Sequence, residues 1–371
     1  MNDNKKILIT LGDVGGIGPE IIIKAINSVK TGIEFSEISI VGNEDIFYRT
    51  ALELGLPVPK DIELINVPFE VSRLKMAEPF QEAGKHSLLC LKKACELVKE
   101  GAARAIVTAP ISKKSLNMAG YHYSGQTEIL KDFLGSGSLY KNLMKTQNGE
   151  YSIKHGIKKF ISKLNKSNKL YGPEMLFVAE NLRVMLLSRH IKLSEVPQNL
   201  TIEKILASII TLKLSLESDF KIKEPRIALC GMNPHAGENG LFGLEEEYFL
   251  TPAVKQLREK YSINIEGPFS ADTLWAKAAK KIMAGEKPEY DAYIACYHDQ
   301  GLIPVKMLAM DYAVNTTINL PVIRTSPCHG TAYDIAGKNK ADYRSMIESI
   351  RLADSISSRK IFDVSKVYNQ I

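Results

Sequence analysis

Three histidines of this 371-residue chain, His190, His235 and His298, lie just past apolar runs that are typical of buried strands. In a parallel sheet the functional groups gather at the carboxyl ends of the strands. Three neutral imidazoles suit a divalent metal such as Zn, Co or Fe, and they leave coordination positions open for a substrate. Because the three are far apart in the sequence they form no compact metal motif, and three unrelated, hydrogen-bonded histidines remain the alternative.

A second group of polar residues follows His298. Lys306, Asn315 and Arg324 are separated by apolar and small residues. A lysine, an amide and a bidentate arginine that converge are well suited to bind a phosphate or a carboxylate. The pattern predicts a small-anion site, unless Lys306 and Arg324 are ordinary solvated charges, as most lysines and arginines are.

Two glycine-containing segments could approach a ligand closely. The loop 326–338 contains Asp334, which could accept hydrogen bonds from a ribose diol, although loops of this composition are also common without a ligand. The turn 12–20 satisfies neither GxGxxG nor the phosphate-binding Gly-Lys-Ser/Thr pattern. We expect it to be a tight turn whose exposed backbone N–H groups face a ligand.

The elements that must position these residues alternate between strands and helices. This alternation predicts the α/β class, with a parallel sheet flanked by helices and sites at the carboxyl ends of the strands. The expected strands are 6–10, 37–41, 105–107, 182–188, 226–231 and 292–296, and the expected helices are 19–29 and 81–100.

Charge and cysteine content narrow the class of protein. Between Leu139 and Pro173, eight lysines and one glutamate give a segment of net charge +7, which leaves the rest of the chain at −1. Within it, apolar residues from Ile153 to Leu164 predict a short basic amphipathic helix that simply faces water, so nucleic acid is not an expected partner. The five cysteines form no CxxC, no secretory signal is evident, and no apolar run approaches the ~20 residues that span a bilayer. We therefore expect a cytoplasmic protein with reduced thiols and no membrane segment.

Eight motifs in order resemble the 4-hydroxythreonine-4-phosphate dehydrogenase family of vitamin B6 biosynthesis. The resemblance covers nearly the whole chain. The motifs are Gly-Asp-x-x-Gly-Ile-Gly-Pro-Glu, Val-Thr-Ala-Pro-Ile-Ser-Lys, Gly-x-Thr-Glu-x-Leu, Leu-Arg-Val-x-Leu, Gly-x-Asn-Pro-His-Ala-Gly-Glu-x-Gly, Gly-Pro-x-x-Ala-Asp-Thr, Tyr-His-Asp-Gln-Gly and His-Gly-Thr-Ala-x-Asp-x-Ala-Gly.

The resemblance implies a fold similar to isocitrate and isopropylmalate dehydrogenases, with two α/β domains and an interdomain cleft. We expect an NAD-side domain made of residues 1–125 and 326–371. Residues 126–325 would form the substrate, metal and dimerisation domain, with the Lys-rich insertion at about 139–173. The active site would be completed by the second subunit of a homodimer.

The resemblance also implies residue roles. It assigns a divalent metal (Zn, Co or Mg) to the three histidines, and catalytic roles to Asp272 and Lys306. NAD would bind the loop His329, Gly330, Thr331, Ala332 and Asp334, where the Asp334 carboxylate would repel the 2′-phosphate of NADP. The phosphorylated substrate would contact Gln126, Thr127, Lys306, Asn315 and Arg324.

The implied reaction is oxidation of 4-phosphooxy-L-threonine to 2-amino-3-oxo-4-phosphooxybutanoate, which decarboxylates to 3-amino-2-oxopropyl phosphate. One departure opens an alternative, because the family usually has His where this chain has Gln126, and Gln carries no charge and shuttles no proton. A dehydrogenase of 4-phospho-threonate or 4-phospho-erythronate is the second hypothesis. A catalytically weakened anion-binding scaffold is the third.

Overall fold

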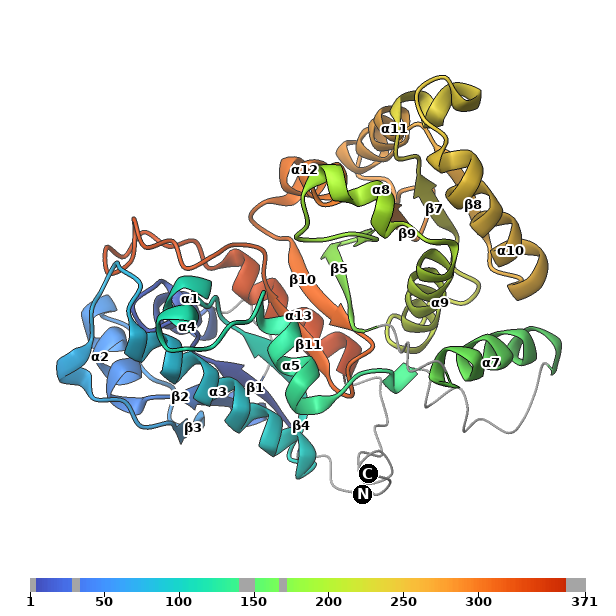
Figure 1. Ribbon diagram of the computed structural model, residues 1–371. Helices are drawn as coiled ribbons and strands as arrows, with labels where there is room; N and C mark the ends of the chain where they lie inside the picture. The colour runs from blue at the N-terminus through green and yellow to red at the C-terminus, as the bar shows by residue number, and fades with distance from the viewer. Residues whose placement is uncertain (1–4, 29–33, 140–150, 167–171, 358–371) are drawn as a thin grey trace. The chain divides into compact units, whose positions relative to one another are not determined.

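The computed structural model describes residues 5–28, 34–139, 151–166 and 172–357 (Figure 1). The chain forms two compact units. Unit 1 consists of Met1–Gly135 together with Asp311–Ile371, and unit 2 consists of Ser136–Met310.

The sheet of unit 1 has the strand order β3-β2-β1-β4-β11-β10. The first five strands of this order, from β3 to β11, run parallel to one another. The sixth strand, β10, runs antiparallel to β11. Its strands are β1 Lys6–Thr10, β2 Ile38–Gly42, β3 Glu63–Asn66, β4 Ala103–Thr108, β10 Val314–Ile318 and β11 Ile323–Pro327. The surrounding helices are α1 Gly18–Ile26, α2 Glu44–Leu54, α3 Gln81–Lys99, α4 Lys113–Met118, α5 Gln126–Leu134 and α13 Arg344–Ser357, with short 3-10 turns at Phe35–Glu37 and Val71–Arg73.

The core of unit 1 forms where helices cover a sheet of apolar strands. Leu8 and Ile106, on β1 and β4, pack in one buried cluster with Leu91 of α3 and Leu130 of α5. The expected 3.6-residue spacing of apolar side chains along 81–100 is confirmed, because these side chains form the buried face of α3.

In unit 2 the strands follow the order β5-β6-β9-β7-β8. β5 is antiparallel to β6, and the remaining neighbours are parallel. Its strands are β5 Glu174–Ala179, β6 Leu182–Leu186, β7 Ile227–Cys230, β8 Ile265–Phe269 and β9 Ala292–Ala295. Its helices are α7 Tyr151–Lys166, α8 Val196–Asn199, α9 Ile202–Ser218, α10 Thr251–Tyr261, α11 Ala271–Met283 and α12 His298–Ala309, with short turns at Leu193–Glu195, Pro234–Gly240 and Glu246–Leu250.

The unit boundaries differ from the expected domains at two places. Residues 126–135 and 311–325 were expected in the domain with the histidines, but they belong to unit 1. Helix α5 buries Ile129 and Leu130 in the unit 1 core, and β11 pairs directly with β4. The physical reason is that these segments complete the apolar core and the sheet of unit 1.

The other expectations about elements hold. Each expected strand and helix is present with ends shifted by a few residues, and the predicted amphipathic helix is α7, which buries Ile157 and Ile161. Residues 140–150 and 167–171 of the Lys-rich segment lie outside the described residues. All five cysteines are free thiols.

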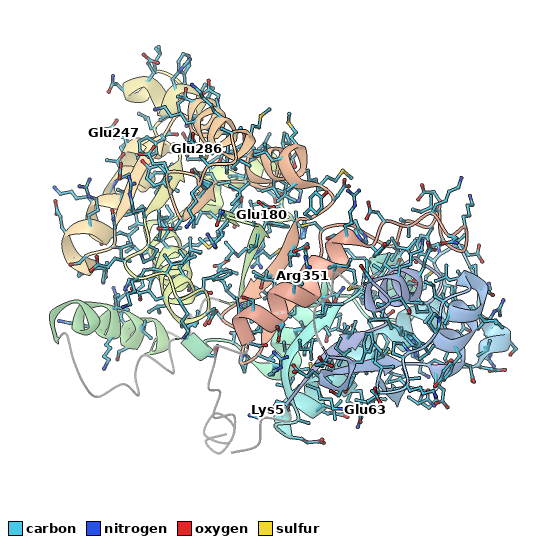
Figure 2. The ribbon with its side chains drawn as sticks, turned by 180° about the vertical axis from the view of Figure 1, so that it is seen from behind. Lys5, Glu63, Glu180, Glu247, Glu286 and Arg351 are labelled. Atoms are coloured by element: carbon cyan, nitrogen blue, oxygen red, sulfur yellow. The ribbon has the colours of Figure 1, made fainter. Side chains whose placement is uncertain are left out.

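Two surface properties follow from the described residues. Charged side chains such as Glu63, Glu247 and Glu286 are exposed to solvent (Figure 2). Across the described ranges, no helix combines the length and the apolar character needed to cross a membrane.

Candidate active site

The three histidines follow three neighbouring parallel strands of unit 2. β9 lies between β6 and β7, so the carboxyl ends of these strands meet at one edge of the sheet. The ring centroids of His190, after β6, and His298, after β9, are 5.6 Å apart. We call these three residues, with His235 after β7, the histidine edge.

His235 lies in a left-handed turn. Residues His235, Ala236, Glu238 and Asn239 all have positive φ, which is unfavourable for side chains other than glycine. The turn is held by the buried Glu246 carboxylate, which accepts hydrogen bonds from the backbone N–H groups of Met232 (2.7 Å) and Asn233 (2.8 Å). Strained backbone of this kind is typical of functional loops.

Asp272, at the start of α11, is electrostatically coupled to His235. A hydrogen bond from Ser270 (2.5 Å) chiefly lowers the pKa of the Asp272 carboxyl, and the charge of His235 lowers it further. The carboxylate is exposed and therefore stays ionised at neutral pH. Asp272 thus provides a negative charge that acts on His235, one of the three residues of the histidine edge.

The described residues of a single chain contain no complete cluster of metal ligands. Among residues 5–28, 34–139, 151–166 and 172–357, no three His, Cys, Asp or Glu side chains are close enough to hold one ion. The chain brings His190 and His298 together and keeps His235 beside Phe242, with ring centroids 6.1 Å apart. The expected site includes a second subunit, so the three-histidine assignment stays a prediction.

Arg324 is the most buried cation of the predicted substrate set. Arg324 is 3% exposed, and its guanidinium donates to Thr108 Oγ1 from Nε (3.1 Å) and Nη2 (2.7 Å), and to Thr317 Oγ1 from Nη1 (3.1 Å). In the described part of the chain, no carboxylate lies within 4 Å of it, although the charge of Glu128 acts on it. Burial lowers the pKa of Arg324 to about 10, so it remains protonated at neutral pH.

Strand register places Asn315 near Arg324, while Gln126 lies at the start of α5. Arg324 on β11 pairs with Thr317 on β10, and Asn315 lies two residues earlier on the same face of the sheet. Gln126 at the start of α5 donates from Nε2 to Ala109 O (3.0 Å), just past the carboxyl end of β4. Gln126 Oε1 and Asn315 Oδ1 are both buried with no hydrogen-bond partner among the described residues. Buried polar atoms without partners are rare and are available to a ligand.

Thr127 and Lys306, the remaining predicted substrate residues, differ in exposure. Thr127 is buried near the N-terminus of α5, where backbone N–H groups favour an anion. Lys306 lies in unit 2 on α12 and is exposed.

The N-terminal glycine-rich turn supports the loop 329–334, which we call the cofactor loop. The backbone N–H of Ile17 donates to Thr331 O (3.0 Å), and a Cβ at Gly16 would come within 2.8 Å of the same oxygen. The expectation of exposed N–H groups facing a ligand is wrong, because the turn is buried and its N–H groups bond within unit 1.

Asp13 is the residue of this turn that the sequence did not single out. Its buried carboxylate accepts hydrogen bonds from Tyr333 Oη (2.9 Å), Ser115 Oγ (2.8 Å) and Gly15 N (2.9 Å). Burial raises the pKa of Asp13, and these hydrogen bonds oppose that shift. An acid inside an otherwise apolar and glycine-rich segment was the available signal.

The cofactor loop presents its predicted residues unevenly. His329 Nε2 is buried without a hydrogen-bond partner among the described residues, whereas Gly330 and Asp334 are exposed. Thr331 and Ala332 are partly buried. A pocket of about 340 Å³ is lined in part by Ala336, Gly337 and Asn339, which follow the cofactor loop in the sequence. Gly16 and Met76 also line it.

Comparison with known proteins gives a consistent result. The family model described as "Pyridoxal phosphate biosynthetic protein PdxA" matches residues 17–353. The chain is similar to the 4-hydroxythreonine-4-phosphate dehydrogenases of Synechocystis sp. (35% identity, 96% of each chain covered) and Desulfosudis oleivorans (36%, 95% of this chain and 96% of the relative). The crystal structure of the Klebsiella pneumoniae enzyme of that name aligns with a TM-score of 0.75 at 33% identity, over 96% of this chain and 98% of the other. The expected α/β class is confirmed.

Proposed function

We propose a function from one premise: the chain belongs to the PdxA family of pyridoxal phosphate biosynthetic proteins. Its reaction is the oxidation of the C3 hydroxyl of 4-phosphooxy-L-threonine with NAD as the hydride acceptor. The product, 2-amino-3-oxo-4-phosphooxybutanoate, loses carbon dioxide to give 3-amino-2-oxopropyl phosphate. Relatives with dehydrogenase names support an enzyme rather than an anion-binding scaffold.

The observation that carries this proposal is the buried Arg324. Among the described residues this interior guanidinium donates to threonine hydroxyls alone, and such a buried charge is costly unless an anion compensates it. The substrate phosphate supplies that anion. The N-terminus of α5 with Thr127 and the amide of Asn315 supply further donors, and Lys306 supplies the second cation.

The donor sets fit the two expected cofactors. His190 and His298 are accessible imidazoles with adjacent rings, as a borderline divalent metal requires, and His235 is the proposed third ligand. A metal held there would supply Lewis-acid stabilisation to the substrate hydroxyl, and NAD held by the cofactor loop would supply the hydride acceptor. The cofactor loop suits NAD, since His329 Nε2 has no hydrogen-bond partner in the described ranges and the exposed Asp334 carboxylate can accept from a ribose diol.

The chain's own groups then bind and orient the substrate. Arg324, Thr127, Asn315 and Lys306 hold the phosphate at one end, which restricts the approach of the carbinol hydrogen to the nicotinamide. Asp272 remains ionised and provides a carboxylate near the metal or the substrate ammonium.

The direct test is NADH formation from 4-phosphooxy-L-threonine, measured by absorbance with and without a chelator. We expect activity that is lost on metal removal and restored by added Zn or Co. Full activity in the metal-free protein would contradict the role of the histidine edge. No NADH from any phosphorylated hydroxy acid would contradict the proposal as a whole.

Gln126 supports a second candidate function, oxidation of 4-phospho-threonate or 4-phospho-erythronate. Its unpaired Oε1 can accept a hydrogen bond but cannot carry a positive charge. A substrate panel separates the two, because reaction with the sugar acids alone would remove the vitamin B6 assignment. The variant Gln126→His should raise the specificity for 4-phosphooxy-L-threonine if the primary proposal holds.

We further propose that the chain works as a homodimer with shared active sites. Ile303, Met307 and Met310 follow one another at helical spacing along α12, with 56%, 81% and 65% of their surfaces exposed. Such an exposed apolar stripe favours self-association, and α12 also carries His298 and Lys306. A partner docked on this face would therefore lie close to both.

Two measurements test the dimer. Light scattering should give a dimer for the wild type and a monomer for Met307→Glu, while Tyr48→Glu, the same change on an exposed face of unit 1, stays dimeric. Mixing the inactive variants His190→Ala and Lys306→Ala should restore partial activity if a site combines residues of two chains. If the mixture of the two inactive variants has no activity, the active site is not shared between chains.

A further inference from the structure

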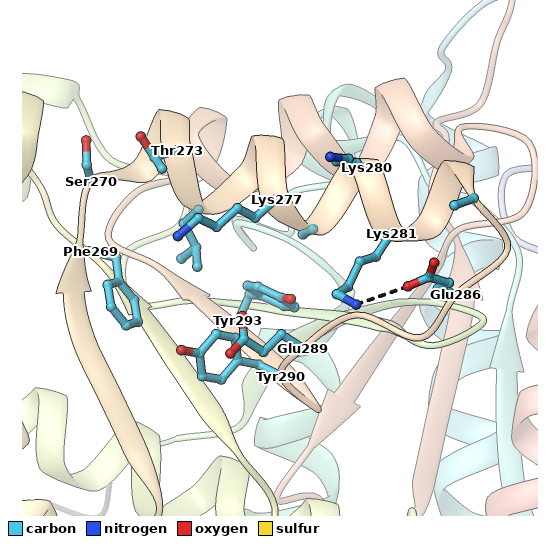
Figure 3. Close-up of a pocket in the computed structure, with 13 residues that line it drawn as sticks. Phe269, Ser270, Thr273, Lys277, Lys280, Lys281, Glu286, Glu289, Tyr290 and Tyr293 are labelled. Atoms are coloured by element: carbon cyan, nitrogen blue, oxygen red, sulfur yellow. Dashed lines mark hydrogen bonds and ion pairs between the residues drawn. The ribbon is translucent and has the colours of Figure 1, made fainter.

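A second pocket lies within unit 2, between α11 and the segment around β9. It has a volume of about 650 Å³, and its lining includes Phe269, Lys277, Lys281, Glu286, Tyr290 and Tyr293 (Figure 3). Small-molecule sites commonly have volumes of about 300–1,000 Å³. We call it the α11 pocket, and none of the predicted site residues lines it.

Aromatic rings form one wall of the α11 pocket. The ring centroid of Tyr290 is 6.0 Å from that of Phe269 and 5.8 Å from that of Tyr293. Tyr290 is fixed by a hydrogen bond from its hydroxyl to Glu266 Oε2 (3.0 Å), and Tyr293 packs against Trp275 with centroids 5.4 Å apart. The wall is therefore held in place before any ligand arrives. Phe269 is its partly exposed ring, while Tyr290 and Tyr293, 6% and 1% exposed, pack behind the pocket surface.

The charges around the α11 pocket leave an excess of positive charge. Lys281 is neutralised by Glu286 (3.0 Å), and Glu289 pairs with Arg226 (3.4 Å). Lys277 and Lys280 have no acidic partner within 4 Å among the residues that the structure describes. Figure 3 shows Lys277 extending from α11 on the side of the aromatic rings.

We propose that the α11 pocket binds a planar aromatic anion, a ring that carries a phosphate or carboxylate. The ring would pack on Phe269 and against the small exposed parts of Tyr290 and Tyr293, and the anionic group would contact Lys277. Lys277 is exposed beside the pocket, so an apolar ligand would gain nothing from its charge, and a simple inorganic anion would make no use of the rings. This ligand class rests on the pocket alone.

The choice of probe rests on the proposed function. The family is described as making pyridoxal phosphate, a pyridine ring with one phosphate. Pyridoxine 5′-phosphate has the same ring and phosphate but no aldehyde, so it forms no imine with lysines. Trp275 is the single tryptophan of the chain and contacts Tyr293 of the pocket wall, so its fluorescence reports on this site.

The experiment titrates pyridoxine 5′-phosphate into the full chain and follows Trp275 fluorescence. We expect saturable quenching, and a Kd about tenfold weaker in Lys277→Gln, because one charge-assisted contact is lost. Lys255→Gln makes the same charge change on the exposed face of α10 and should leave Kd unchanged. Both variants should keep the wild-type Tm and the wild-type rate of NADH formation.

Three outcomes would overturn the proposal. They are no quenching, equal Kd values for Lys277→Gln and Lys255→Gln, and an equal response to inorganic phosphate or to pyridoxine without its phosphate. None of these outcomes bears on substrate oxidation. Failure of the proposed function would instead appear as absent NADH formation in the wild type.

Discussion

In unit 1 Arg324 is 3% exposed and its guanidinium is hydrogen-bonded to two threonines, whereas in unit 2 His190 and His235 are exposed to solvent. The cofactor loop of unit 1 is likewise tied to a buried turn through Ile17 and Asp13. The His235 turn, by contrast, is held from one side by Glu246. The proposed ligand-binding groups of unit 1 are held in place within that unit, whereas the proposed groups of unit 2 would be completed by a ligand or a second chain.

The buried Arg324 and the exposed histidines represent two kinds of binding site. A preformed anion pocket lowers the ordering cost of binding, at the expense of burying a charge without a partner. An open set of imidazoles costs little in the free protein and gains its order when the metal binds. The following substitutions test whether the two regions behave in these different ways.

The largest effect should come from the histidine edge. His298→Ala removes one proposed ligand, and we expect kcat/KM to fall by about a thousandfold, since metal stabilisation of developing charge is worth several kcal/mol, here roughly 4. Tm without metal should be unchanged, because the ring is only partly buried. Bound metal is measured by elemental analysis, and a variant that keeps both metal and activity would contradict the assignment.

The next largest effect should come from Arg324→Gln. Loss of the buried phosphate partner should lower kcat/KM for the phosphorylated substrate about a hundredfold, equivalent to ~3 kcal/mol. KM for NAD should not change. Because the charge is uncompensated in the free protein, Tm should not fall, and a large drop in Tm with unchanged kinetics would make Arg324 a structural residue.

The third prediction concerns pH and His86, a buried histidine of unit 1. Burial lowers the pKa of His86 to about 4. Between pH 6.5 and about 4 the unfolded chain binds a proton that the folded chain does not, so stability is lost as pH falls through this window. The full loss is about 3 kcal/mol.

Urea unfolding at several pH values checks this expectation. In His86→Gln the decline between pH 6.5 and 4 should become shallower, because Gln does not titrate. His122→Gln, an exposed histidine of the same unit, provides the matched control. Equal pH profiles for wild type and His86→Gln would show that this burial has no energetic consequence.

The smallest effect should come from the support of the cofactor loop. Tyr333→Phe removes the hydrogen bond to Asp13, and we expect KM for NAD to rise about fivefold, equivalent to ~1 kcal/mol, with little change in kcat. Tyr312→Phe removes a hydroxyl on the exposed surface and should change neither constant. A fall in kcat alone would indicate that Asp13 and Tyr333 do not position the cofactor.

Sequence patterns predicted the parts of the structure that depend on local periodicity. The alternation of apolar runs and helical spacing gave the strands and helices, and the runs before His190, His235 and His298 correctly indicated adjacent strand ends. The assignment of 126–135 and 311–325 failed for a different reason. Which core a helix or strand joins depends on packing, and its own sequence does not specify this.

Hydrogen-bond partners that are far apart in the sequence could not be predicted either. Thr108 and Arg324 are 216 residues apart and meet because β4 and β11 pair in one register. Asp13 and Tyr333 are 320 residues apart, and no spacing rule connects them. The cytoplasmic location, the metal and the use of NAD remain predictions.

The discontinuous build of unit 1 has a consequence for synthesis on the ribosome. β11 pairs with one edge of β4, and β11 is translated only after the whole of unit 2. Until then the nascent chain presents the apolar strand Ala103–Thr108 with an unpaired edge, a template for pairing with other chains. A truncated chain that ends before residue 323 therefore keeps this unpaired, aggregation-prone strand edge, and it lacks the cofactor loop.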